Sequence, residues 1–408
     1  MLRTGALSPM QFPHTMPTPL NASSSTRNGL EILQGRSGFA QLAPEWRRLV
    51  ETQTPAQTSP FQHPDWIGAW LESICTEPDG LRLLALRHHD ELVAVLPLVP
   101  HACPLARLLP QWTMIQGPHM VLTELAGDPS RWPAMLQALL RQRTLRCSAL
   151  QLPAVIHELA PAAEALPAGS TMRRVHRSES AWLDCSGDIE QALARVQRSF
   201  RQNLRRLGRR ADSQGQVALE VADTPAALEE ALTHFLDIEA SGWKGRSGSA
   251  IRDDARLVGF YRALVRDFGA RSQCRIHRLT LDGRTVAAQF ALRGGRQLNL
   301  LKIGYDEAFS AIAPGHLLMM RIIERSCADP ALDRLSLVTH PSWAHLWKPQ
   351  LAEVDHLTLT MPGWDGRLLG RLMQWRDQRR ARAAQAPSAP VSEPASSTLP
   401  PQTQFGGT

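Results

Sequence analysis

Residues 275–339 read RIHRLTLDGRTVAAQFALRGGRQLNLLKIGYDEAFSAIAPGHLLMMRIIERSCADPALDRLSLVT, and this stretch decides the fold. Two segments rich in apolar and β-branched residues flank Asp282-Gly283, a strong signal for a tight hairpin turn. A third such segment follows the turn at Gly294-Gly295. We therefore predict three consecutive antiparallel strands at 275–281, 285–292 and 297–303.

A loop and a helix follow the third strand. The loop, 304–313, ends at Pro314-Gly315, and an unbroken helical stretch then runs over 316–326. A short strand at 335–339 comes next, and a right-handed crossover can return it to the sheet beside the third strand. The first amides of such a helix have no partners inside it, and together with the helix dipole they suit an anion.

The order of these elements resembles the central half of the GCN5-related N-acetyltransferase (GNAT) fold, whose loop before the helix cradles the pyrophosphate of acyl-coenzyme A. Of the family's Gln/Arg-x-x-Gly-x-Gly/Ala motif, Ser310-Ala-Ile-Ala-Pro-Gly-His316 keeps only the glycine near the helix start. Gly304-Tyr-Asp306, Pro314-Gly315 and Glu239-Ala-Ser-Gly-Trp-Lys-Gly245 resemble the BioF2-like and CelD-like acetyltransferases, distant relatives of the Fem peptidyl aminoacyltransferases. The resemblance covers 197–347 well and the earlier residues faintly.

Length and a weak internal repeat indicate two tandem halves. A strand hairpin at 81–99 precedes the Asp282-Gly283 hairpin by about 190 residues. The resemblance implies an α/β fold of two acetyltransferase-like halves, each a mixed, mostly antiparallel sheet flanked by helices. We expect a disordered segment (1–28), a degenerate first half (29–170), a second half with the acyl-CoA site (171–365), a basic helix (366–382) and a disordered tail (383–408).

Composition places the chain among globular proteins of a reducing compartment. Of its 408 residues, 43% are hydrophobic and 20% are charged. The six cysteines form no C-x-x-C pair, which argues against zinc and against a disulfide framework. Neither a signal peptide nor an apolar run of about 18 residues is visible, so we expect a soluble, cytoplasmic protein without a transmembrane segment. The oligomeric state stays open.

The net charge of +7 suits an anionic partner, and much of the excess lies in one segment. We expect a strand at 182–185 and a helix from about Ile189, in which seven arginines follow one another from Arg195 to Arg210 with no acid between them. These arginines either form a solvated basic face or hold a charged acceptor, and we assign Arg201 and Arg205 to substrate binding. Specific nucleic-acid recognition is not expected, because interleaved aromatic residues are missing.

Acyl transfer to an amine needs an anion cradle, a group that keeps the amine unprotonated and hydrogen bonds for the developing oxyanion. Candidate catalytic residues are Glu239, Tyr305 and Asp306. Candidate donor-binding residues are Lys302, Ser310, Pro314, Gly315, His316 and Leu317. Candidate acceptor-binding residues, besides the two arginines, are Trp243, Lys244, His340 and Trp343. We expect no metal site, because His340 and His345 have no third ligand at a suitable spacing.

The resemblance implies an N-acyltransferase that moves an acyl group from acyl-CoA, a co-substrate rather than a resident cofactor, to an amine. The acceptor would be an amine-bearing small molecule or glycan precursor, possible in polysaccharide or cell-envelope biosynthesis. Two alternatives remain open. The arginine segment favours a Fem-like aminoacyltransferase that uses aminoacyl-tRNA, and the eroded loop motif favours a non-catalytic accessory protein of exopolysaccharide synthesis.

Overall fold

The fold is that of a computed structural model, which describes residues 29–54, 58–103, 107–117, 119, 120, 122, 124–142, 145–162 and 166–385. The segment 1–28 and residues 386–408, both expected to be disordered, lie outside this part of the chain. The basic C-terminal helix, α10 (Trp364–Gln385), begins two residues before the expected helix and continues three residues into the expected tail.

The first half contains a strand, two helices and a hairpin, followed by two short strands, a helix and a last strand. Its elements are β1 (Gly29–Gln34), α1 (Gly35–Glu51), α2 (Pro64–Ser73), β2 (Arg82–His88), β3 (Glu91–Pro100), β4 (Gln111–Met114), β5 (Ala126–Gly127), α3 (Trp132–Arg141) and β6 (Ala149–Ile156). Leu42, Trp46 and Val50 recur every four residues along α1 and are buried, so this helix turns one apolar stripe toward the core.

The second half begins with two additional helices and then follows a similar order of a strand, helices, a hairpin, a strand, a helix and a last strand. Its elements are α4 (Ile189–Ala192), α5 (Arg198–Asp212), β8 (Val217–Ala222), α6 (Pro225–Ser241), α7 (Trp243–Arg246), α8 (Ala255–Gly269), β9 (Cys274–Leu281), β10 (Arg284–Gly294), β11 (Gln297–Tyr305), α9 (Pro314–Ala328) and β12 (Arg334–Ser336). The predicted hairpin is confirmed, since β9 and β10 pair across Asp282-Gly283. The return of the chain beside the third strand is confirmed too, because β12 runs parallel to β11.

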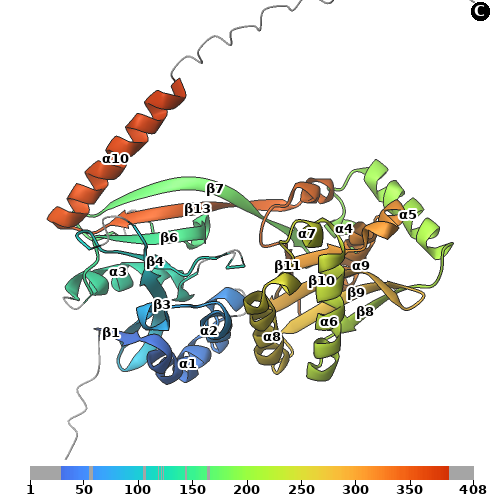
Figure 1. Ribbon diagram of the computed structural model, residues 1–408, viewed down its shortest axis with the longest axis horizontal. Coiled ribbons are helices and arrows are strands. Elements are labelled where there is room, and N and C mark those ends of the chain that lie inside the picture. The colour runs from blue at the N-terminus through green and yellow to red at the C-terminus, as the bar shows by residue number, and fades with distance from the viewer. Residues whose placement is uncertain are drawn as a thin grey trace, which may run out of the picture.

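Two long strands, β7 (Thr171–Asp184) and β13 (Gln350–Thr360), connect the halves into one sheet (Figure 1). The strand order is β1-β2-β3-β4-β6-β13-β7-β12-β11-β10-β9-β8, with β5 paired to β3. The last strand of the chain, β13, therefore lies beside β6 of the first half, and β7 lies beside β12 of the second half. The last strand of the chain, β13, thus completes the sheet of the first half, and β7, which follows the first half directly, completes the sheet of the second.

The expected helix from Ile189 is wrong in its extent, because the chain breaks between α4 and α5. Leu193 and Val196 in this break are both buried, and Gln197 then takes an extended conformation before α5 begins. Arg195 consequently lies outside both helices.

The two halves share an apolar core. Trp66 of α2 packs edge-to-face on Phe260 of α8, with ring centroids 5.2 Å apart. The Nδ1 atom of His119 lies 3.0 Å from the hydroxyl oxygen of Tyr261 on α8. One cluster of buried side chains includes residues of both halves, from Leu42 to Phe290. Neither half therefore has a complete core by itself.

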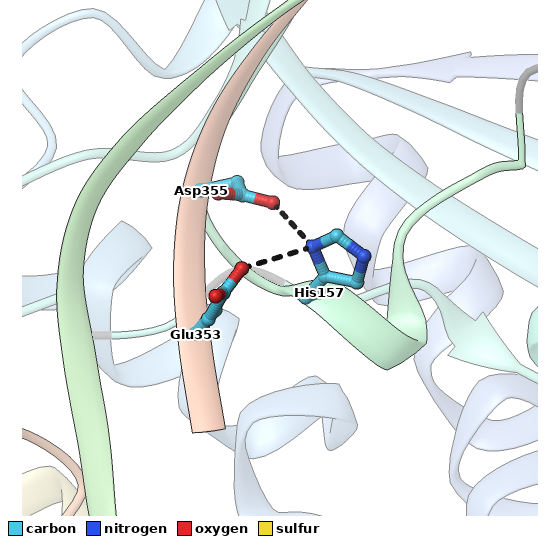
Figure 2. A group of neighbouring side chains, drawn as sticks. All are labelled: His157, Glu353 and Asp355. Carbon is cyan, nitrogen blue, oxygen red and sulfur yellow. Dashed lines mark hydrogen bonds and ion pairs between the residues drawn. The ribbon is translucent and has the colours of Figure 1, made fainter. Parts of the chain in front are cut away.

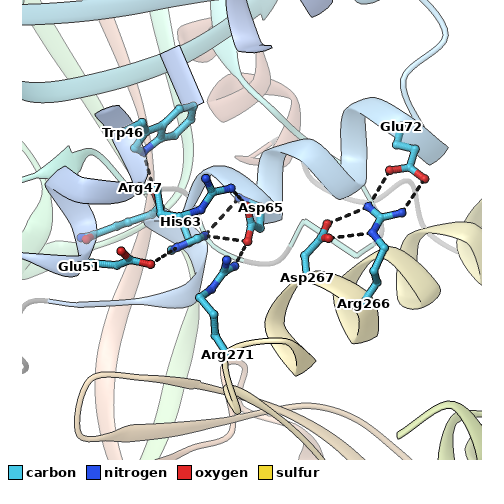
Figure 3. Close-up of polar contacts among 10 residues, drawn as sticks. Trp46, Arg47, Glu51, His63, Asp65, Glu72, Arg266, Asp267 and Arg271 are labelled. Carbon is cyan, nitrogen blue, oxygen red and sulfur yellow. Dashed lines mark hydrogen bonds and ion pairs between the residues drawn. The ribbon is translucent and has the colours of Figure 1, made fainter. Parts of the chain in front are cut away.

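Polar contacts cross the same interface (Figure 3). Asp65 of α2 is buried and accepts a hydrogen bond from Arg47 of α1, at 2.7 Å, and it also pairs with Arg271, which follows α8. At the surface, Arg266 of α8 pairs with Glu72 of α2 at 2.9 Å. The exposed pair contributes little to the free energy of unfolding. Removal of an arginine partner of the buried Asp65 would instead leave part of its charge uncompensated, which destabilises the fold.

We predict that a fragment from Arg173 onward does not fold by itself. It would expose the face of α8 that packs on Trp66 and would leave β13 without its partner β6. Size-exclusion chromatography and thermal melting should show an aggregated or non-cooperative species. A monomeric fragment with one cooperative melting transition would contradict this.

A second prediction concerns the stability of the protein at low pH. Burial, together with the nearby Arg275 and Arg325, lowers the pKa of His277 to about 3. The unfolded chain protonates this histidine below about pH 6.5, but the folded chain does not until about pH 3. The contribution of His277 is thus complete above about pH 6.5, and it reduces the free energy of unfolding by about 1.4 kcal/mol per pH unit as the pH falls toward 3.

Urea denaturation at several pH values measures this dependence. In the His277→Gln variant the free energy of unfolding should fall less steeply with decreasing pH, because one titrating group has been removed. All other titrating groups are common to the variant and the parent, so the difference between their curves isolates His277. Replacement of the exposed His234 by Gln serves as the control and should keep the slope of the parent. Parallel stability curves for His277→Gln and its parent would show that the buried imidazole is not responsible.

Candidate active site

The candidate site lies where two parallel strands part. β11 and β12 pair only at residues 297–299 and 334–336. Beyond this point β11 continues to Tyr305, whereas the chain after β12 turns at Val338, which has a φ of +62°. Because a positive φ is strained for a β-branched residue, the surroundings must hold it, and the Val338 amide donates to Ser336 Oγ at 3.0 Å. The sheet is consequently open between the two segments.

A β-bulge lies at the same place. Phe290 of β10 pairs with Lys302, and Ala291 pairs with Leu300, so Leu301 is the extra residue on β11. A bulged residue is left without a partner in the ladder, and the bulge bends its strand. The bend lies just beyond the last pair that β11 forms with β12.

A cavity of about 390 Å³ occupies the opening. One wall is residues 300–305 of β11, and the other is the segment after β12. A second cavity, of about 230 Å³, leads to the start of α9 and shares Ile303, Tyr305 and Trp343 with the first. The two cavities together form a track from the middle of the sheet to a helix N-terminus, which we call the cleft.

The start of α9 offers fewer amides than the sequence suggests. Ala313, in the left-handed region at φ +48°, precedes the helix, and its carbonyl oxygen accepts from the amides of His316 and Leu317, at 3.0 and 3.2 Å. Pro314 has no N–H. The Gly315 amide has no acceptor among the described residues, so it is the donor left for an anion. Four of the predicted donor-binding residues line the second cavity: Ser310, Pro314, Gly315 and His316.

Glu239 lies on α6 and lines the first cavity. Its side chain is buried, and Oε2 accepts a hydrogen bond from the Ile251 amide at 2.9 Å. The helix rests directly on β11, because a Cβ atom at Gly304 would lie 2.7 Å from the Cα atom of Glu239. The absence of a side chain at Gly304 therefore sets the position of Glu239 beside the strand.

Tyr305 and His316 lie where the two cavities meet the helix start. Tyr305 lines both cavities and is 41% exposed. The His316 ring lies edge-to-face with Phe200 and with Trp343, at centroid distances of 5.5 and 6.2 Å. Burial lowers the pKa of His316, which favours the neutral imidazole at pH 7.

The arginine helix α5 lies at the same end of the cleft. Phe200 of α5 packs on Trp347 at 5.3 Å, and α5 contacts both α9 and the 3₁₀ helix η7 (Glu307–Ile312). Arg201, predicted with Arg205 to bind the acceptor, has a buried Nε atom without a hydrogen-bond partner among the described residues. This position places α5 near the helix start rather than beside the cavity that Glu239 lines.

Several predicted residues lie outside the walls of both cavities. Asp306 caps η7 and pairs with Arg284 at 2.6 Å, and His340 pairs with Glu179 at 2.8 Å. Leu317 is buried under the helix start. Lys302 and Trp343 do line the first cavity. The remaining two, Trp243 and Lys244, belong to α7, but their side chains lie outside the described part of the structure.

The sequence reasoning missed four polar residues of the first cavity, namely Gln289, Glu307, Thr339 and Ser342. Glu307 lines it and pairs with Arg246 at 2.8 Å. Gln289 also lines it, is buried and donates to the Phe290 carbonyl oxygen at 3.0 Å. A glutamine inside the apolar run of β10 was a usable signal, whereas Glu307 stands among ordinary loop residues.

A separate polar cluster joins the central strands (Figure 2). His157 Nδ1 lies 3.0 Å from Asp355 Oδ2 and 3.6 Å from Glu353 Oε2, an arrangement that could hold a cation. Arg174 of β7, however, already donates to Asp355 at 2.6 Å. Because the guanidinium compensates the buried carboxylate, the group is best described as an ion-pair network between β7, β13 and the turn that follows β6.

Comparisons with known proteins agree with this geometry. Residues 198–345 match the model of the acetyltransferase (GNAT) domain family. Among solved structures, FemX is similar with a TM-score of 0.55 and 14% identity, over 77% of this chain and 95% of FemX. The C-terminal domain (DUF2156) of an Agrobacterium fabrum protein named as a lysylphosphatidylglycerol synthetase is similar with a TM-score of 0.51 and 12% identity, over 81% of this chain and 95% of that domain. No curated protein matches the sequence.

The chain therefore has a GNAT-type fold in a Fem-like arrangement, and residues 198–345 form a GNAT acyltransferase domain. The matched range begins with α5 and ends at His345, two residues after Trp343, the last residue that lines the cleft. It includes the parted strands, the bulge and the start of α9. The expected fold class is confirmed, and the expected superfamily is confirmed for the matched residues.

Replacement by alanine should lower the stability of the protein at one glycine of the cleft, Gly304, and should hardly change it at another, Gly315. In Gly304→Ala the new methyl group would meet the Glu239 backbone, so α6 must move, and we expect a loss of about 1–3 kcal/mol of unfolding free energy together with lower turnover. In Gly315→Ala the methyl group meets Tyr305 at 3.5 Å, an ordinary contact, and stability should hardly change. Denaturant titration of both variants tests this pair, and equal stabilities would refute the close approach at Gly304.

Proposed function

We propose that the second half transfers an acyl group from acyl-CoA to an amine. The observation that carries this is the opening between β11 and β12, where the cavity lined by Glu239 and the cavity at the start of α9 share three lining residues. An extended thioester with a phosphate group at one end fits such a track. The first half lacks an equivalent of the long β11, because β4 ends at Met114 and a separate β5 pairs with β3.

The donor would lie along β11. The Gly315 amide, the helix dipole and Ser310 favour its pyrophosphate at the start of α9. Lys302 lies farther along the track, on the side of the first cavity. The position of α5 suggests that Arg201 and Arg205 interact with donor phosphates, and we propose this role in place of acceptor binding.

The reaction would occur where the two cavities join. The acceptor nitrogen attacks the thioester carbonyl carbon, a C–N bond forms, and the C–S bond breaks. Glu239 would take the proton that leaves the nitrogen, directly or through a water molecule, and Tyr305 would give a proton to the leaving thiolate. The amide of the bulged Leu301 is suited to stabilise the oxyanion, because a bulged residue has no partner in the ladder.

The acceptor would occupy the first cavity. Glu239 and Glu307 offer carboxylate oxygens that accept hydrogen bonds from a neutral amine, and Trp343 offers an aromatic surface. An amino sugar, an amino acid derivative or a glycan precursor meets this description. We place the reaction in the cytosol and in the synthesis of a polysaccharide or of the cell envelope.

Aminoacyl transfer from tRNA is the second candidate. The basic α5 next to the helix start favours it, because a phosphate-rich donor end could lie there as well. The two donors make opposite predictions for the same protein. Acetyl-CoA should bind stoichiometrically if the first proposal holds, and only aminoacyl-tRNA should bind and turn over if the second holds.

Isothermal titration calorimetry with acetyl-CoA tests the placement of the donor. Gly315→Ala should weaken binding several-fold, and Gly315→Glu should abolish it, because the side chain fills the second cavity and places a negative charge where the phosphates lie. Arg325→Gln is the matched control, since it changes the net charge equally on the same helix but near its other end. Undiminished binding by Gly315→Glu would remove the donor from this site.

A further inference from the structure

Helix α10 has an apolar stripe that no described residue covers. Large apolar side chains rarely cluster on the surface of a soluble protein, yet four of the seven that are exposed in the described part belong to this helix. They are Trp364, Leu368, Leu372 and Trp375, with exposed fractions of 66, 43, 38 and 56%. Spacings of four, four and three residues place them on one face.

The opposite face of α10 is already attached to the protein. Leu369 is buried against Leu109 and Ala149, and Met373 packs on the same cluster. Asp377 accepts from Arg173 Nε at 2.6 Å, so the attachment extends past the middle of the helix. In Figure 1 the helix projects from the outer end of the first half. The stripe is therefore held in place and faces away from the body.

The charges of α10 are separated between the same two faces. Asp365 accepts from Ser148 Oγ at 2.8 Å, and Asp377 pairs with Arg173, so both acids bind the body of the protein. The charged side chains left exposed on the helix up to residue 379 are all arginines: Arg367, Arg371, Arg376 and Arg379. The outward face thus combines apolar and cationic groups and has no exposed acid.

We propose that α10 binds in the interface of a membrane bilayer that contains anionic lipids. Leucine side chains at this depth enter the acyl region, while tryptophan rings favour the boundary between apolar and polar layers. Arginine stems pass the apolar layer and bring the guanidinium groups to lipid phosphates. Trp364 and Trp375 lie about 16 Å apart along the helix axis, so the whole stripe can lie flat on one surface.

Other occupants fit the charges less well. Residues 1–28 contain no acid and residues 386–408 contain only Glu393, so neither segment can compensate the exposed arginines. A second copy that packed stripe on stripe would bring the same arginines against each other. None of the described helices is long and apolar enough to cross a membrane, so the contact that we propose is with the surface.

Flotation of the full chain with lipid vesicles tests this inference. The chain should bind vesicles that contain phosphatidylglycerol, should not bind pure phosphatidylcholine, and should dissociate as salt is added. Leu368→Asp with Leu372→Asp should weaken binding at least about tenfold. Arg367→Gln with Arg371→Gln should weaken it less and flatten the salt dependence. Leu351→Asp, at a side chain 47% exposed on β13, is the control and should bind like the parent.

Unchanged melting temperatures would show that all these surface variants fold. Failure of the parent to bind anionic vesicles, or equal binding to neutral ones, would overturn the proposal. So would sedimentation data showing a dimer that the Leu368→Asp and Leu372→Asp double variant dissociates, because the stripe would then be a contact between copies. The acyltransferase proposal is independent of each of these outcomes.

Discussion

The antiparallel ladder between β7 and β13 is the interaction on which the rest of the structure depends. It extends from the pair Gln350 and Trp182 to the pair Thr360 and Thr171, and it joins two half-sheets that would otherwise end at β6 and β12. The wall of the cleft that follows β12 leads directly into β13. Both ends of this wall are therefore tied to β7, so the two strands that join the halves also fix the ends of the wall.

The second fixed point is the contact of α6 with β11 at Gly304. Burial of apolar surface in the shared core presses the helices against the sheet, and the glycine allows the backbones to approach without an intervening side chain. As a result, Glu239 and the bulged strand occupy a defined relative position. The groups that we propose to be catalytic are thus carried by a helix and a strand rather than by flexible loops.

Local patterns in the sequence predicted the elements of the second half, because Asp282-Gly283 and Pro314-Gly315 encode a turn and a helix start within a few residues. Long-range features were not predictable in this way. The strand expected at 182–185 is the end of the much longer β7, whose polar earlier part pairs with a segment almost 180 residues away at Gln350 to Thr360. For the same reason, the strained turn at Val338 and the cavity residue Glu307 left no local signal.

The pairing of β6 with β13, the last strand of the chain, also determines when the protein can complete its fold during synthesis. β6 keeps an unpaired edge until β13 leaves the ribosome, although nearly 200 residues separate the two strands in the chain. The first half must therefore wait, with an open hydrogen-bonding edge, for the last strand of the protein. Such an edge is a template for wrong pairing, so a nascent chain that stalls between β6 and β13 is the form of this protein most exposed to aggregation and most in need of a chaperone.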